Sequence, residues 1–223
     1  MDALGEVARL WRYPVSSFGG EGQRQLDVGS GGVRGDRLFG VVDAQTGEPA
    51  RPDRDERWRP VARIATRLGD GGLLEVALPD GPWMAVPSAE CDRALSDYFG
   101  FGVSLRPFAE AELPDYVGPQ TEPRYTKAPI HLLTTASLAR LQALNPTGIP
   151  DARRFRPNVL VDMPAVEDSF PETEWIGRRI AVGDVEMTIS EPCRRCGFTI
   201  IAQDGFDHDP GILRSLVRHN GHN

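Results

Sequence analysis

Two short stretches decide the expected fold: Arg154-Phe155-Arg156-Pro157-Asn158 and Pro192-Cys193-Arg194-Arg195-Cys196. The first leads into the strand-like run 159–161, and the second follows another run rich in β-branched residues. Gly183-Asp184 lies between them and is a two-residue turn typical of a β-hairpin. We therefore expect arginines, an amide and a cysteine pair on neighbouring strands and turns. Such a set suits an anionic ligand that carries a soft metal atom.

The size and charge of the chain bear on its class of function. A chain of 223 residues can form one large domain, or two small ones, with a buried core. The formal net charge is −7 and no dense basic stripe is present, so a nucleic-acid partner is not expected. No secretory signal and no apolar run of membrane-spanning length is visible, so no membrane partner is expected either. Three cysteines fit a reducing compartment, and we expect a cytoplasmic protein.

Alternating polarity and turn residues predict a chain with more strands than helices. The predicted strands, including a hairpin around residues 69–72, are 7–13, 38–42, 61–67, 73–78, 131–133 and 159–161. Helices are predicted from Ser88 to Phe99, after a Thr135 cap, and after Asp209-Pro210. The buried face of the last helix is expected to comprise Ile212, Leu213, Leu216 and Val217.

Composition changes between residues 106 and 129, where proline and acidic residues become frequent. This stretch is the expected boundary between an N-terminal β-rich part, residues 1–110, and a C-terminal part, residues 111–223. The helices fall between groups of strands. This order favours a barrel-like fold of mixed α+β class, β-rich with few short helices.

The spacing of Cys193 and Cys196 admits several interpretations. A thioredoxin-type pair would open a helix, but Gly197 and a β-branched run follow. The two residues could equally be inert core cysteines. A third interpretation, a structural zinc site, would need two further ligands from a group that contains Cys91, His131, His208, His219 and His222.

A further interpretation is a thiolate ligand to a soft or redox-active metal that a cofactor brings in. Arg194 and Arg195 favour it locally, because adjacent positive charge stabilises a thiolate.

The arginine-rich stretch also has two interpretations. Arg154, Arg156 and Asn158 could form a surface cluster on an edge strand, or they could recognise a phosphate and a pterin ring edge. Arg37 could pair with its neighbour Asp36 or make a second anion contact. The loop around Ser16-Ser17 resembles a loose anion cradle, although such loops are commonly plain turns. No Walker loop, dinucleotide fingerprint or nucleophile motif is present.

Taken together, these segments resemble the MOSC family, which is named for the C-terminal domain of molybdenum-cofactor sulfurases and includes amidoxime-reducing proteins. The matches follow the family's order over nearly the whole chain. They are Tyr13-Pro14-Val15-Ser16-Ser17 with Gly19 for "YPVKS…G", Gly35-Asp36-Arg37 for "GDR", Phe155-Arg156-Pro157-Asn158 for "FRPN", and Cys193-Arg194-Arg195-Cys196 for "CxRC".

The resemblance implies a MOSC β-barrel packed against an N-terminal β-rich subdomain, and a molybdenum cofactor (Mo-molybdopterin). It implies that Cys196 is the catalytic thiolate ligand to molybdenum. The residues that would hold the pterin and its phosphate are Ser16, Ser17, Arg37, Arg156, Asn158, Arg194 and Arg195. Pyridoxal phosphate is not expected, because nothing assigns an aldimine to the single lysine, Lys127.

The implied activity is two-electron reduction of an N- or S-oxygenated small molecule, with electrons from a separate redox protein. A sulfur-carrying or cofactor-handling protein and a non-catalytic binding module are the alternatives. Two departures from the family pattern stand out. Ser16 occupies the place of the family's lysine, and relatives continue beyond the position of Asn223 with strands that complete the barrel. We therefore expect a shortened chain or a barrel that closes differently.

Overall fold

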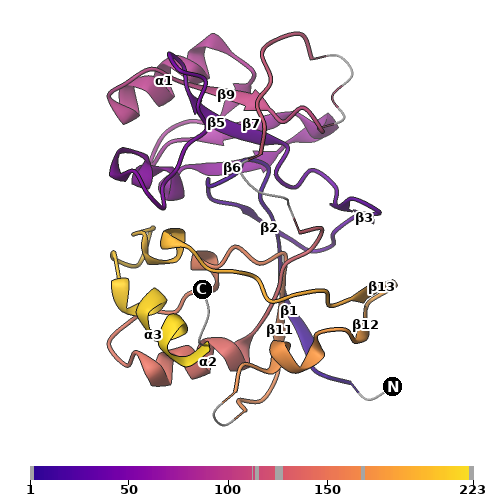
Figure 1. Cartoon of the computed structure of the whole chain (residues 1–223). Helices are drawn as coiled ribbons and strands as arrows, with labels where there is room; N and C mark the ends of the chain where they lie inside the picture. The colour runs from indigo at the N-terminus through magenta and orange to yellow at the C-terminus, as the bar shows by residue number, and fades with distance from the viewer. Residues whose placement is uncertain (1–2, 112, 114–115, 124–127, 167–168, 221–223) are drawn as a thin grey trace.

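The computed structural model describes residues 3–111, 113, 116–123, 128–166 and 169–220. Lys127 and the zinc-ligand candidate His222 lie outside these residues. The chain forms two lobes, shown one above the other in Figure 1. The upper lobe is built mainly from the N-terminal half and the lower lobe mainly from the C-terminal half. The fold is mixed α+β and β-rich, as the sequence predicts.

The upper lobe contains two antiparallel sheets around one apolar core. The first sheet has the strand order β6 (Ala65–Leu68), β7 (Leu74–Ala77), β8 (Met84–Val86). In the second, β5 (Phe39–Asp43) pairs with β9 (Val103–Pro107). The 3-10 helices are Glu56–Arg63 and Asp70–Gly72. Residues from both sheets, including Val41, Val76 and Leu105, are buried in this core together with Trp58. The predicted strand 61–67 begins only at Ala65, because the first of these 3-10 helices occupies the preceding residues.

The helix α1 (Ala89–Phe99) covers this core and ends as predicted. The hydroxyl of Ser88 accepts a hydrogen bond from the backbone N–H of Cys91 at 3.1 Å, so it caps the first turn. Gly100 has φ of 77°, a left-handed conformation that costs glycine little and terminates the helix.

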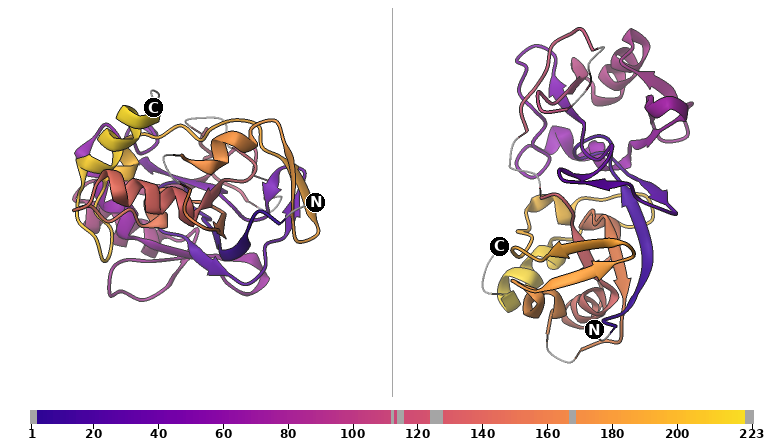
Figure 2. Two further views of the ribbon diagram at one scale, coloured as in Figure 1. Left: turned by 90° about the horizontal axis from the view of Figure 1, so that it is seen from below. Right: turned by 90° about the vertical axis from the view of Figure 1, so that its right-hand side faces the viewer.

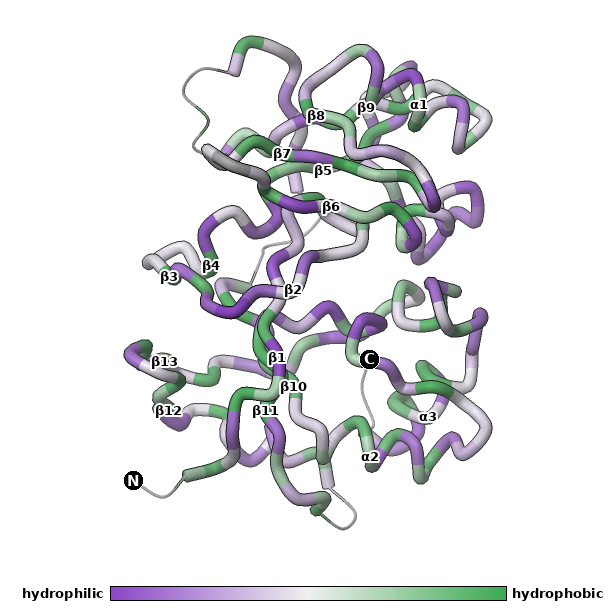
Figure 3. The backbone as a smooth tube through the Cα atoms, turned by 180° about the vertical axis from the view of Figure 1, so that it is seen from behind, coloured by the Kyte–Doolittle hydropathy of each residue, from purple (hydrophilic) through white to green (hydrophobic). Residues whose placement is uncertain are grey.

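The lower lobe is organised around a four-stranded sheet. Its strand order is β10 (Leu132–Thr134), β11 (Val159–Asp162), β1 (Glu6–Arg12), β2 (Glu21–Gln23). The strand β1 comes from the N-terminus of the chain, yet it pairs antiparallel with β11. Figure 2 shows β1 rising along the lower lobe towards the upper one. Figure 3 shows β2 at the level between the two lobes.

Helices cover the lower sheet. The strands β10 and β11 are parallel, and α2 (Thr135–Leu144) and the 3-10 helix Ala152–Arg154 lie in the connection between them. The N-cap of α2 is Thr134, one residue before the predicted cap. The last helix, α3 (Pro210–Asn220), buries Ile212 and Leu216 as predicted. The prediction for Val217 is wrong: its side chain is 40% exposed because α3 turns only one narrow face to the core.

Short elements complete the chain. The hairpin predicted at Gly183-Asp184 is confirmed, and Gly183 has φ of 57°. The remaining elements are β12 (Arg179–Val182), β13 (Val185–Thr188), β3 (Val28–Gly29), β4 (Gly32–Val33) and the 3-10 helices Pro171–Trp175 and Gly197–Ile200.

Two expectations require correction. In the part of the chain that the structure describes, the strands form separate sheets of two to four strands, and none closes into a barrel. Short strands interrupted by 3-10 turns do not supply the continuous pairing that closure needs. The β-branched run after Cys196, from which no helix was expected at this point, forms the short 3-10 helix Gly197–Ile200. Within the described ranges, no helix is long and apolar enough to span a membrane.

Candidate functional site

Three of the predicted anion-binding residues, Arg37, Arg156 and Asn158, are linked through hydrogen bonds at the junction of the two lobes, whereas Arg194 is exposed. Asp36 has no exposed surface and lies at the centre of this junction. Its carboxylate accepts hydrogen bonds from the backbone N–H of Tyr13 at 2.8 Å and from the side-chain amide of Asn158 at 3.2 Å. It also forms an ion pair with Arg37. Arg37, from the N-terminal half, and Asn158, from the C-terminal half, therefore bind the same buried carboxylate.

Arg156 connects the junction to the loop that contains Ser16 and Ser17, called here the serine loop. Its guanidinium donates to the carbonyl oxygens of Val15, at 3.2 Å, and of Phe18. These two carbonyls lie on either side of the dipeptide Ser16-Ser17. Arg156 therefore determines the shape of the turn that presents both serine hydroxyls. Its guanidinium also stacks on the ring of Tyr13, with the central carbon 4.3 Å from the ring centroid.

Asn158 braces the same junction from inside. Its amide nitrogen donates to Asp36 and to the carbonyl of Trp11, at 3.2 and 3.3 Å, and its oxygen accepts from the backbone N–H of His131 at 3.0 Å. The side chain has no exposed surface. In this structure Asn158 therefore acts on the site through its neighbours.

Backbone strain is concentrated at these residues. Among the described non-glycine residues, four have positive φ: Ser17 (69°), Arg37 (53°), Arg156 (54°) and Asp80 (58°). The first three are predicted site residues. Left-handed backbone is costly outside glycine and persists where the surroundings impose it, commonly at functional sites. This clustering supports a ligand-binding role for the junction.

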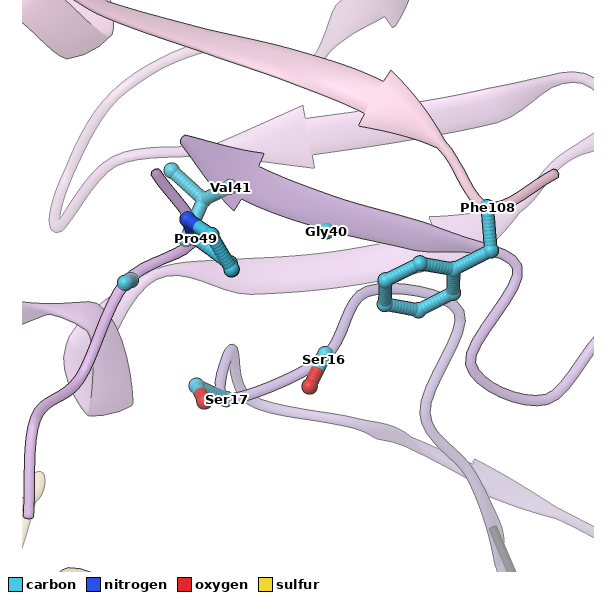
Figure 4. A pocket seen from close by; sticks show the side chains of 7 residues that line it. Ser16, Ser17, Gly40, Val41, Pro49 and Phe108 are labelled. Atoms are coloured by element: carbon cyan, nitrogen blue, oxygen red, sulfur yellow. The ribbon is translucent and has the colours of Figure 1, made fainter. Parts of the chain in front are cut away.

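Ser16 and Ser17 face a small pocket beneath β5 (Figure 4). Its empty volume is about 250 Å³, which includes open solvent. Residues of β5, of the segment after the following turn and directly after β9 complete its lining: Gly40, Val41, Pro49, Ala50 and Phe108. A side chain at Gly40 would meet the ring of Phe108, since an added Cβ would lie 2.9 Å from it. The pocket brings two hydroxyl groups beside an apolar wall.

The cysteine loop places both thiols at the surface. Cys193 and Cys196 are exposed, whereas Arg195 is half-buried. The carbonyl of Cys196 accepts from the backbone N–H and the hydroxyl of Thr199, at 3.2 and 3.0 Å. Phe198, from the same turn, packs on the core of the upper lobe. The sulfur of Cys196 is thus displayed on an anchored loop and does not point into an apolar interior.

Arg154 holds the far side of this loop. The sequence admitted a surface charge cluster or a phosphate or pterin contact for it, and its burial overturns the surface interpretation. Its side chain is 1% exposed and donates to four carbonyl oxygens, at 2.8 to 3.2 Å: Ile149, Thr199, Ile201 and Asp207. Burial lowers its pKa from the usual arginine value. The interpretation of residues 154–158, called here the RFRPN stretch, as a charge cluster concealed this role. A buried arginine that binds main-chain carbonyls leaves no sequence pattern of its own.

His131 is a second residue whose place only the structure reveals. It precedes β10, and it was a candidate only as a zinc ligand. Its ring lies between the carbonyl of Arg156, 3.3 Å from Nδ1, and the guanidinium of Arg195, 3.0 Å from Nε2. It therefore connects the RFRPN stretch with the cysteine loop.

The metal alternatives receive no support from clustering. In the described ranges, no three or more His, Cys, Asp or Glu side chains gather as a metal site would require. Cys91 is buried in α1, and burial raises the pKa of its thiol to about 12, so it is an inert core residue.

The donor set at the junction fits an anionic cofactor that carries a soft metal. Arg37 pairs with the buried carboxylate of Asp36 and donates to the carbonyl of Arg156, and His131 connects that carbonyl to Arg195, so three arginines are joined within a protein of net charge −7. An exposed thiol, the ligand type that soft metals prefer, follows Arg195 directly. In addition, the hydroxyl of Tyr13 is buried and has no hydrogen-bond partner among the described residues. An unpaired buried hydroxyl is costly, which favours a polar ligand here.

Comparison with known proteins agrees with this arrangement. A family model described as MOSC domain matches residues 105–222, and one described as MOSC N-terminal beta barrel domain matches residues 4–111. The chain is also similar to mitochondrial amidoxime-reducing component 1 of Homo sapiens. The two are 22% identical over 245 residues, which cover 96% of this chain and 69% of the human protein.

Proposed function

The chain belongs to the MOSC family, and we propose that it binds molybdenum cofactor at the junction of its two lobes. When bound, the cofactor supplies the two-electron chemistry that removes oxygen from an N- or S-oxygenated small molecule, with electrons from a separate redox protein. The similarity to an amidoxime-reducing component supports this class of activity. The residues of the chain bind, orient and tune the cofactor.

Cys196 would supply the protein thiolate to the metal. Its exposure on a loop anchored from both lobes is the observation that carries the proposal. A thiolate ligand is soft and electron-rich, so it suits molybdenum better than a hydroxyl or a carboxylate would. Arg194 and Arg195 directly precede it and bring positive charge to the same loop.

The arginines would balance the phosphate and the negative charge of the pterin carrier. Arg37, Arg194 and Arg195 offer guanidinium donors, and Ser16 and Ser17 offer hydroxyl donors from the pocket beneath β5. Arg156 and Asn158 would contribute by holding these groups in place, since their own donors bind carbonyls and Asp36. Ser16, in the place of the family's lysine, offers hydrogen bonds without charge.

Metal analysis of protein from a host that makes the cofactor tests this proposal. We expect molybdenum in the wild-type protein and a loss of at least about tenfold in Cys196→Ala, because the thiolate ligand is removed. Cys193→Ala is the matched control, because Cys193 is an exposed thiol of the same loop. We expect it to retain molybdenum.

Other outcomes would redirect the assignment. Equal molybdenum content in wild type and Cys196→Ala would contradict the ligand role of Cys196. Absence of molybdenum, with one added sulfur on Cys196 by mass spectrometry, would favour the sulfur-handling alternative. Molybdenum without turnover of amidoxime or sulfoxide substrates under an artificial reductant would indicate a binding module.

A further inference from the structure

His131 lies between two parts of the site that are far apart in the sequence. It is 9% exposed and sits directly before β10. Its backbone carbonyl accepts from the N–H groups of Asn158 and Val159, at 2.7 and 3.1 Å, and its own N–H donates to the side-chain oxygen of Asn158. These bonds fix the position of the imidazole relative to β11.

The hydrogen bonds of the ring determine which of its two nitrogens carries the proton. A guanidinium only donates, so Nε2 of His131 must accept from Nη2 of Arg195, at 3.0 Å. The remaining proton is then on Nδ1, which donates to the carbonyl of Arg156 at 3.3 Å. The same carbonyl accepts from Nη2 of Arg37 at 3.1 Å. The imidazole is therefore a neutral connector within a cluster of cations.

The charges that face the ring support a neutral imidazole. Burial lowers the pKa of His131 well below 6.5, and the positive charges of Arg195, from the cysteine loop, and Arg37, from the segment before β5, lower it further. Arg156 presents its carbonyl to the ring and directs its guanidinium towards the serine loop. The carboxylate of Asp36 is bound by Arg37 and Asn158.

Arg195 is oriented by two contacts. Its guanidinium lies over the ring of Phe155, with the central carbon 5.1 Å from the centroid, and Nη2 is bound to His131. In the described part of the chain, no other hydrogen-bond partner of this guanidinium is found. The His131 contact thus sets the direction of the remaining N–H donors of Arg195, the residue that directly precedes Cys196 in the sequence.

We infer that His131 is a positioning residue that aims the Arg195 guanidinium at the anionic ligand held beside Cys196. The ring accepts from Arg195 and donates to the RFRPN stretch, so it keeps the cysteine loop in register with the arginine cluster. The identity of the ligand rests on the proposed function. The His131–Arg195 contact does not, and it is tested separately.

Nitrogen-15 NMR of the cofactor-free protein tests the contact. The signals of His131 are identified by their loss in His131→Gln. We expect a neutral ring with the proton on Nδ1 from about pH 6 to 8, and a shift of the Nε2 signal in Arg195→Ala. A charged ring, a proton on Nε2, or an Nε2 signal unaffected by Arg195→Ala would overturn the inference.

Molybdenum content tests the consequence for the ligand. We expect His131→Leu to lower it by about tenfold, as is typical for residues that orient the groups of a metal site. His131→Gln should retain most of it, because an amide can accept from Arg195 and donate to the Arg156 carbonyl. His208→Leu is the matched control, because His208 is exposed.

The two failures can be told apart. Full molybdenum content in His131→Leu would contradict the positioning role. Wild-type protein without molybdenum would contradict the proposed function, whereas the NMR result would still decide the His131–Arg195 contact. Circular dichroism of each variant identifies loss of folding, and if His131→Leu does not fold, the NMR result on the His131–Arg195 contact decides.

Discussion

Buried arginines in this protein bind main-chain carbonyl groups. Arg154 binds four of them around the cysteine loop, and Arg156 binds two around the serine loop. Arg195 instead uses one nitrogen on His131 and remains half-buried. A guanidinium carries five N–H donors, so the same residue type can brace a loop or receive an anion. The burial of the side chain and its hydrogen-bond partners show which of the two roles an arginine has.

At the residue scale, His131 predicts a dependence of stability on pH. Its pKa in the folded protein lies well below the 6.5 of an unperturbed histidine, so below pH 6.5 the unfolded chain binds the extra proton. Above pH 6.5 this histidine should therefore not reduce the free energy of unfolding. As the pH falls from 6.5 towards the lowered pKa, the free energy of unfolding should decrease by up to about 1.4 kcal/mol per pH unit.

Chemical denaturation at several pH values measures this dependence. His131→Gln should flatten the decrease below pH 6.5, whereas His208→Gln should leave it unchanged. The same slope in wild type and His131→Gln would show that His131 does not titrate as inferred.

At the scale of elements, the loop after Cys196 depends on a clamp from outside it. The 3-10 helix Gly197–Ile200 is too short to be stable alone, and Arg154 supplies donors to the carbonyls of Thr199 and Ile201. The position of the Cys196 thiol is therefore a property of the lower lobe as much as of the cysteine loop.

Arg154→Lys tests this dependence. A lysine presents three donors at one point and cannot reach four carbonyls, so we expect a loss of about 3 kcal/mol in the free energy of unfolding. Amide hydrogen exchange should accelerate at Thr199 and Ile201. Arg153→Lys, a neighbouring exposed arginine paired with Asp151, is the control. Unchanged exchange at both amides in Arg154→Lys would contradict the clamp.

At the scale of the whole molecule, the two lobes are joined by more than the chain crossing between them. The N-terminal strand β1 is part of the lower sheet, and Asp36, Arg37 and Arg156 bond across the junction. Buried polar contacts of this kind couple neighbouring parts of a fold strongly. The junction is therefore expected to open only when the molecule unfolds.

Differential scanning calorimetry tests the coupling. We expect a single unfolding transition for the wild-type protein, because β1 and the arginine cluster join both lobes. Arg156→Met retains an unbranched chain of similar shape but removes the donors to Val15 and Phe18. It should lower the transition temperature, and the two lobes should then unfold in two separate transitions. Two transitions already present in the wild type would show that the lobes unfold independently.

The local elements were determined by the sequence alone. Ser88 and Gly100 delimit α1, and Gly183-Asp184 produces its hairpin, because capping and turn chemistry depend on a few adjacent residues. The motif set also identified the family. The tertiary structure alone decided that the sheets remain separate, that Cys196 opens a 3-10 turn, and that Arg154, Asn158 and His131 brace the site. Each of these three braces has a partner more than twenty residues away in the sequence, and no local pattern of polarity records which carbonyl or imidazole a buried donor will meet.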